Sequence, residues 1–103
     1  MNTAKVSLIL NAHLPFVRHP EYPRFLEEDW LFESISESYL PLLRMCNRLA
    51  EDKVPYVFTI SLSPSLCTML KDPVLAERYT QYLERHIELG EKEVKRCAAE
   101  QPE

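Results

Sequence analysis

With 103 residues, 46% of them hydrophobic and 27% charged, the chain is long enough for one small domain with a buried core. Its net charge is −4 and no basic block stands out, which argues against phosphate binding, so we expect no nucleic-acid partner. The apolar runs are far shorter than the ~18 residues of a membrane-spanning helix, so we expect no membrane partner either.

The first predicted element is a strand over residues 5–10, a mostly apolar run without charge after Lys5. A loop is predicted over residues 13–24. Three prolines support it, because each disfavours a helical conformation in the residue before it: Pro15, Pro20 and Pro23.

A helix is predicted to begin near Phe25 or Leu26, since three acidic residues then fall where the helix dipole favours negative charge: Glu27, Glu28 and Asp29. Apolar residues recur at helical spacing as far as Tyr39. Pro41 should break or kink the helix, and a second helical piece should end near Asp52.

A second strand is predicted over residues 56–62, which are rich in β-branched and aromatic side chains. The following Ser-Pro-Ser should cap a short helix that ends at Leu70. Asp72 is expected to be the N-cap of a long amphipathic helix over residues 74–97, with a frayed tail after residue 98. The apolar stripe of this helix comprises Leu75, Tyr79, Leu83, Ile87 and Val94.

The predicted order is β-α-α-β-α-α with connections long enough for parallel strands, which indicates the α/β class. Both strands read as buried on two faces, yet two parallel strands are too few for a covered sheet. We therefore expect residues 1–98 to be one part of a larger domain and the chain alone to self-associate through exposed apolar surface. Three widely spaced cysteines suggest half-buried reduced thiols in a cytoplasmic protein: Cys46, Cys67 and Cys97.

The stretch NAHLPFVRHPE, residues 11–21, leaves the first strand at its carboxyl end, where parallel α/β folds place their binding loops. His13 could there bind a hydroxyl, act as an acid or base, or be held by nearby backbone. Arg18 and His19 could line the same site or serve as structural loop contacts.

Other chemistries have weaker support in this sequence. The two histidines of the loop lie six residues apart without a familiar ligand spacing, so we predict no metal and no cofactor. A catalytic pair drawn from the acidic residues of the first helix is disfavoured, because such a cluster usually forms a solvated helix start. No phosphate-binding loop, nucleophile elbow or Cys-His signature is present.

Three blocks of the sequence resemble the N-terminal region of glycoside hydrolase family 57, in its α-glucan branching enzyme and amylase-type members. They are LILNAHLPFVRHPE, FLEEDWLFESISESYLPLL and VPYVFTISLSPSL. The resemblance implies the opening segment of an incomplete seven-stranded (β/α) barrel and a retaining enzyme acting on α-1,4-glucan. Such chemistry needs a nucleophilic Glu and an acid/base Asp. In the family both lie downstream, so we expect no catalytic residue in this chain.

The resemblance also implies roles for individual residues. His13 matches a histidine of the sugar subsite at the cleavage point, and Trp30 matches an aromatic near the glucan groove, although a core-facing position is an equal alternative. Asn11 stands where many branching enzymes have His, and Leu14 where many relatives have Gln, so the polar lining differs here. No role follows for Arg18 or His19.

Two other functions remain open. The chain could be a non-catalytic interaction module that kept this part of the fold. A metal-dependent polysaccharide deacetylase on a similar barrel is less well supported, because no strand-end Asp pair or paired histidines occur.

Overall fold

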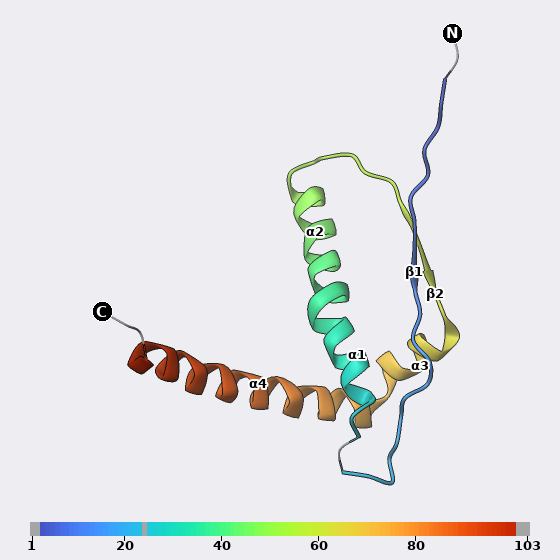
Figure 1. Ribbon diagram of the computed structural model, residues 1–103. Helices are drawn as coiled ribbons and strands as arrows, with labels where there is room; N and C mark the ends of the chain where they lie inside the picture. The colour runs from blue at the N-terminus through green and yellow to red at the C-terminus, as the bar shows by residue number, and fades with distance from the viewer. Residues whose placement is uncertain (1–2, 24, 101–103) are drawn as a thin grey trace.

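The computed structural model describes residues 3–23 and 25–100. The predicted order of strand, two helical pieces, strand and two helices is confirmed, and the chain is an α/β protein (Figure 1). The elements are β1 (Ile9–Ala12), α1 (Glu28–Ser34), the π-helical segment η1 (Ile35–Tyr39), α2 (Leu40–Glu51), β2 (Thr59–Leu62), α3 (Pro64–Lys71) and α4 (Pro73–Glu100).

The two strands form a parallel sheet, in a register that pairs Ile9 with Thr59 and Ala12 with Leu62. Both strands are shorter than predicted, and the first is shifted, so that Asn11 lies within β1 and not in the loop. The reason is pairing, because only the four residues opposite β2 find a partner. The expected burial on two faces is absent from this chain, since every residue of β2 is exposed.

Residues 28–51 form one helical run in which the ladder changes at Pro41. Proline lacks a backbone N–H, and its ring clashes with the carbonyl four residues earlier. The wider π-helical turn of η1 lies immediately before it and accommodates this clash. The predicted break is therefore absent, and the change at this proline is one of hydrogen-bonding ladder only. The run starts at Glu28, later than predicted, after turns closed by Phe25 and Leu26 carbonyls.

The predicted caps of the last two helices are confirmed. The Ser63 hydroxyl accepts a hydrogen bond from the Leu66 N–H at 3.3 Å at the start of α3. The Asp72 carboxylate accepts from the Val74 N–H at 2.9 Å at the start of α4. This helix extends to Glu100, beyond the predicted end, and the remainder of the expected frayed tail lies outside the described residues.

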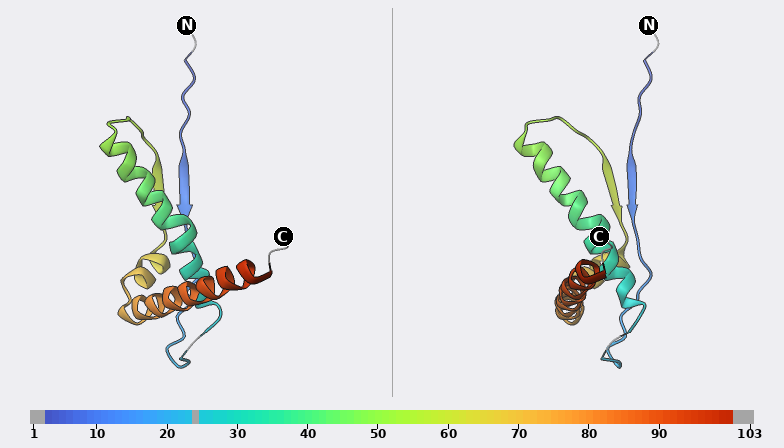
Figure 2. Two further views of the ribbon diagram at one scale, coloured as in Figure 1. Left: turned by 90° about the vertical axis from the view of Figure 1, so that its left-hand side faces the viewer. Right: turned by 60° about the vertical axis from the view of Figure 1, so that its left-hand side comes forward.

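The core forms where α1, α3 and the first half of α4 meet, at the base of the molecule (Figure 2). Leu75 is buried and Tyr79 packs against the core, as the predicted stripe requires. The rest of that stripe is exposed, because the second half of α4 projects away from the other elements (Figure 1). Tyr82 is buried in its place, and burial raises the pKa of its hydroxyl. The core side chains are Val17, Leu31, Phe32, Leu66, Met69, Leu75 and Tyr82.

Of the three cysteines, all of which are free, Cys46 and Cys67 are half-buried as predicted. Cys97 is exposed on the projecting part of α4, so its predicted partial burial is wrong. None of the helices in the described part of the chain is both long and apolar enough to cross a membrane.

The described residues form an open arrangement with a radius of gyration of 18.9 Å. A compact domain of this length has a radius of about 13 Å. We expect the isolated chain to self-associate or to bind hydrophobic dyes, with its helical amides better protected from exchange than those of the sheet. Sedimentation and amide exchange test this, and a sharp monomer with strongly protected strand amides would contradict it.

Candidate functional site

The loops that leave β1 and β2 are joined at the carboxyl edge of the sheet. The Ser63 N–H donates to the Ala12 carbonyl at 3.1 Å, and the Ser65 hydroxyl donates to the Leu14 carbonyl at 2.8 Å. His13 lies between these two cross-links, directly after β1, and its side chain is exposed. The backbone on both sides of His13 is therefore held while its imidazole stays available to a ligand.

Asn11 contributes a second polar side chain to this edge. It is exposed and pairs in register with Ser61 of β2, which is exposed as well. Among the residues that the structure describes, neither Asn11 nor His13 makes a side-chain hydrogen bond or an ion pair. We call Asn11, His13 and Ser61 the strand-end set.

Arg18 and His19 belong to the loop beyond this set and make contacts within the chain. The Arg18 guanidinium forms an ion pair with Asp72, the N-cap of α4, without hydrogen-bond geometry at Nε. The His19 ring lies 3.1 Å from a Glu21 oxygen and 3.6 Å from the centre of the Phe25 ring. The structure thus assigns both side chains structural contacts and does not group them with His13.

The Glu21 carboxylate responds to this environment. A backbone hydrogen bond, and then the hydrogen bond with His19, lower the pKa of Glu21 below its usual value. Glu21 and His19 thus form a local contact within the loop.

Trp30 lies on α1 with 51% of its surface exposed and takes no part in the core. The alternative that Trp30 faces the core is therefore wrong. Within residues 3–23 and 25–100, no hydrogen bond or ring contact joins Trp30 to His13.

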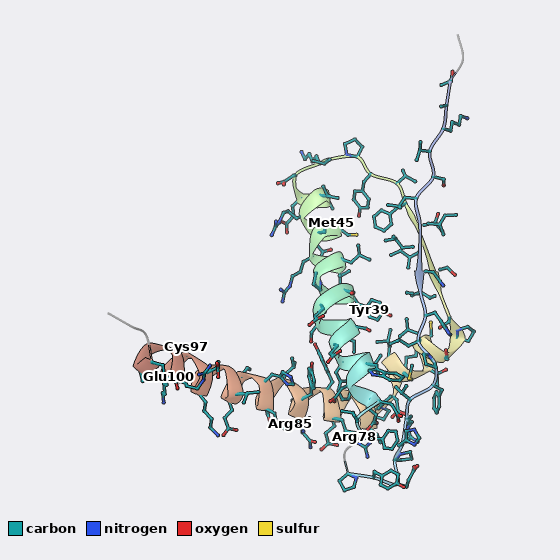
Figure 3. All side chains as sticks on the ribbon, viewed as in Figure 1. Tyr39, Met45, Arg78, Arg85, Cys97 and Glu100 are labelled. Atoms are coloured by element: carbon teal, nitrogen blue, oxygen red, sulfur yellow. The ribbon has the colours of Figure 1, made fainter. Side chains whose placement is uncertain are left out.

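A half-buried arginine fixes the far end of the loop. Arg78 of α4, labelled in Figure 3, donates through Nη1 to both carboxylate oxygens of Glu28, at 2.5 and 2.8 Å. It also donates to the carbonyl of His19 at 3.1 Å and to that of Tyr22 at 2.5 Å. We call these contacts of Arg78 the loop clamp.

Because of the loop clamp, one of the acidic residues at the start of α1 is buried and paired instead of solvated. Glu28 is only 1% exposed, and its charge is balanced by Arg78, whose side chain is 14% exposed. Glu28 is therefore a structural carboxylate and not part of a solvated face. The 50-residue separation left no signal in the sequence, because nothing in the local pattern links the two positions.

The core provides a further anchor for the loop. Val17 is buried, and its N–H donates to the sulfur of Met69 at 3.4 Å. The three prolines of the loop restrict its backbone conformations. The structure adds fixation by α3 and α4, which hold it at Leu14, Val17, His19 and Tyr22.

The described residues include no group of three or more His, Cys, Asp or Glu placed to hold a metal ion. The carboxylate of Glu28 is occupied by Arg78, so it is not free to serve in a catalytic pair. What the strand-end set offers is an exposed imidazole, an amide and a hydroxyl, which can donate hydrogen bonds to and accept them from a polar ligand.

These features define an α/β protein with a fixed, polar edge at the carboxyl ends of its parallel strands, the position at which such folds place their binding loops. Comparison with known families identifies it more closely. Residues 7–101 match the family described as glycosyl hydrolase family 57, and the chain belongs to that family.

Three relatives illustrate the match. A 1,4-α-glucan branching enzyme of Thermococcus kodakarensis is 34% identical over 91 residues, which are 87% of this chain and 13% of that enzyme. A probable 1,4-α-glucan branching enzyme of Mycobacterium tuberculosis is 34% identical over 68 residues, 65% of this chain and 12% of its own.

The third relative is a solved structure, that of the α-amylase AmyC from Thermotoga maritima. It superposes with a TM-score of 0.84 at 46% identity and covers 93% of this chain. The match covers 18% of AmyC, so the chain spans less than a fifth of each of these relatives.

Proposed function

We propose that this chain is the N-terminal portion of an α-glucan-active enzyme of glycogen or starch metabolism, of the branching or amylase type. The observation that carries the proposal is the likeness to AmyC over 93% of the chain, at an identity well above that of a shared fold alone. In this proposal the two strands open an incomplete seven-stranded (β/α) barrel, and the loops at their carboxyl ends form part of the glucan cleft.

The proposed roles follow the positions of the side chains. His13 and Asn11 bind sugar hydroxyls, because they are exposed at the strand end on a backbone held by Ser63 and Ser65. Trp30 offers an exposed ring on which a sugar face can stack. Arg18 and His19 act indirectly, by keeping the loop in place.

Catalysis requires more than this chain supplies. Retaining glycoside hydrolysis needs two carboxyl groups about 5–5.5 Å apart on either side of the scissile bond. We propose that both come from polypeptide beyond these residues and that no cofactor takes part. We also propose a cytoplasmic location, because the three cysteines are free.

The isolated chain is accordingly expected neither to hydrolyse nor to branch amylose. Binding groups without the catalytic carboxylates leave the glycosidic barrier almost unchanged. Release of reducing ends and the decrease of iodine staining measure the two activities. Activity that co-elutes with the pure chain would contradict this expectation.

A family-length chimera tests the proposed function itself. In it, this chain replaces the matching region of AmyC, which its 46% identity makes compatible. We expect the folded chimera to act on α-glucan. A chimera with native-like thermal unfolding and no activity would count against the proposal.

The alternative of a non-catalytic interaction module has one supporting observation, the extent of exposed apolar surface on both strands and on α2. The coding sequence after codon 103 separates the two readings. A continuing frame that encodes the catalytic motifs supports the enzyme, and its absence supports the module.

A further inference from the structure

The Ser-Pro-Ser turn that follows β2 contacts the backbone of the residue after His13. The Ser65 hydroxyl donates to the Leu14 carbonyl at 2.8 Å, and its oxygen lies 3.2 Å from the hydroxyl oxygen of Ser63. The Ser63 oxygen in turn accepts from the Leu66 N–H at 3.3 Å. These contacts join the first turn of α3 to the segment that carries His13, although Leu14 and Ser65 are 51 positions apart. We call them the serine chain.

The direction of each hydrogen bond in the serine chain follows from the protons available. A serine hydroxyl has one proton, and a carbonyl oxygen can only accept. The proton of Ser65 is therefore committed to Leu14, so Ser63 must be the donor between the two serines. Each hydroxyl thus donates once and accepts once, an arrangement in which neighbouring hydrogen bonds strengthen one another. With its proton committed, the Ser65 hydroxyl serves the backbone beside His13.

The serine chain starts from a fixed support. Ser63 precedes a proline, which favours the extended conformation that it adopts, with φ −75° and ψ 146°. Its N–H donates to the Ala12 carbonyl at 3.1 Å, and its carbonyl accepts from the Cys67 N–H at 3.1 Å. Because the backbone of Ser63 is held on both sides, Ser65 presents its hydroxyl to Leu14 from a defined position.

At its other end the serine chain holds the segment that directs the His13 side chain. Ala12 and Leu14 are half-buried and pack against the core, whereas His13 between them is exposed. This alternation continues that of β1 and directs the imidazole away from the core. The hydrogen bond of Ser63 to Ala12 fixes the strand side of His13, and the hydrogen bond of Ser65 to Leu14 fixes the loop side.

We propose that Ser65 is a positioning residue that acts on the glucan reaction through His13, by keeping the imidazole where it meets the sugar. The inference rests on the proposed function of His13. A hydroxyl that only stabilised the fold would have the same effect on the rate whether or not the imidazole is present. The effect of a positioning hydroxyl on the rate disappears when the imidazole is removed, because residues that act as a unit are not additive.

A double-mutant cycle in the folded chimera with AmyC tests this difference. Ser65→Ala should lower kcat/KM about fivefold, the effect of losing one neutral hydrogen bond. In a chimera that already carries His13→Ala, the same substitution should change kcat/KM by less than about twofold. An equal loss in both backgrounds, or no loss when His13 is present, would overturn the proposal.

The matched control is Thr68→Val on the same helix. The Thr68 hydroxyl also donates to a carbonyl, that of Pro64 at 2.9 Å, but this hydrogen bond lies within α3 and does not reach the loop. Thr68→Val should therefore change kcat/KM by less than about twofold. A loss equal to that of Ser65→Ala would mean that any hydroxyl of α3 supports the rate, and the proposal would be wrong.

A spectroscopic measurement tests the positioning without activity. In a chimera with labelled histidine rings, the His13 resonance is identified by its loss in His13→Ala. Ser65→Ala should shift or broaden this resonance, because the freed segment samples further positions, and Thr68→Val should leave it unchanged. An unchanged His13 resonance in Ser65→Ala would overturn the proposal. If the chimera is inactive but the resonance responds as expected, the glucan function fails while the positioning of His13 by Ser65 stands.

Discussion

Replacing Arg78 by alanine should lower the free energy of unfolding by about 3–5 kcal/mol. The substitution leaves the Glu28 carboxylate, 1% exposed, without its counter-charge in the core junction of α1 and α4. Breaking a buried ion pair by removing one partner has an effect of this size. The carbonyls of His19 and Tyr22 lose their donor at the same time, so the loop is released together with the helix contact. Urea denaturation followed by helical circular dichroism measures the change.

A matched control lies on the same helix. Arg96 also pairs with glutamates, Glu93 and Glu100, but these side chains are more than half exposed. Arg96→Ala should therefore change the free energy of unfolding far less than Arg78→Ala does, because exposed ion pairs contribute little to stability. Equal effects of the two substitutions would mean that Glu28 does not depend on Arg78. Glu28→Gln adds a further check, because it keeps the shape and removes the charge.

The parts of the fold that were predictable from sequence are those that depend on neighbouring residues. The caps at Ser63 and Asp72 were predicted correctly, because Ser-Pro and Asp-Pro place a side-chain acceptor and a fixed φ at the start of a helix. The change of hydrogen-bonding ladder at Pro41 follows from a missing N–H, but the predicted break is absent. The strand bounds were not predictable in the same way, because pairing with a distant segment decides which four residues form β1.

In the candidate site, too, only the features that depend on neighbouring residues were predictable from the sequence. The position of His13 at a strand end followed from the apolar run before it and the prolines after it. The loop clamp did not, because the partners of Arg78 come from residues 19–28, at least 50 positions away. Arg18 and His19 were candidates for the site on residue type alone. Only the neighbouring Asp72, Glu21 and Phe25 show that their contacts are structural.

The strand-end set and the open apolar groove between α2 and the sheet share Asn11, but they differ in how completely they are formed within this chain. The strand-end set is held by hydrogen bonds from Ser63 and Ser65 and by the loop clamp, all of which are complete within this chain. The groove is open, and Leu43 of α2 and Leu62 of β2 on its two walls are both more than half exposed. The backbone of the strand-end set is therefore fixed within this segment, while the apolar surface beside it stays exposed.

In the chimera with AmyC, His13→Ala should lower kcat/KM by one to two orders of magnitude, roughly 1.4–2.7 kcal/mol of transition-state stabilisation. The physical reason is that the imidazole is exposed and carries no core packing, while the backbone on either side is fixed by hydrogen bonds of Ala12 and Leu14. Its removal therefore takes away ligand contacts without disturbing the fold. Steady-state kinetics on a soluble α-glucan and a thermal unfolding curve for the same variant measure both consequences.

The second histidine of the same loop supplies the control. His19 is hydrogen-bonded to Glu21, and its ring contacts that of Phe25, so His19→Ala should lower the melting temperature while changing kcat/KM by less than about threefold. Both variants replace a histidine of the same loop. His13→Ala should lower kcat/KM, and His19→Ala should lower the melting temperature. If His13→Ala instead lowers the melting temperature with unchanged kinetics, His13 is a structural residue and the strand-end set does not bind glucan. If both variants lose activity equally, the loop acts as a unit and the separate assignment of His13 is wrong.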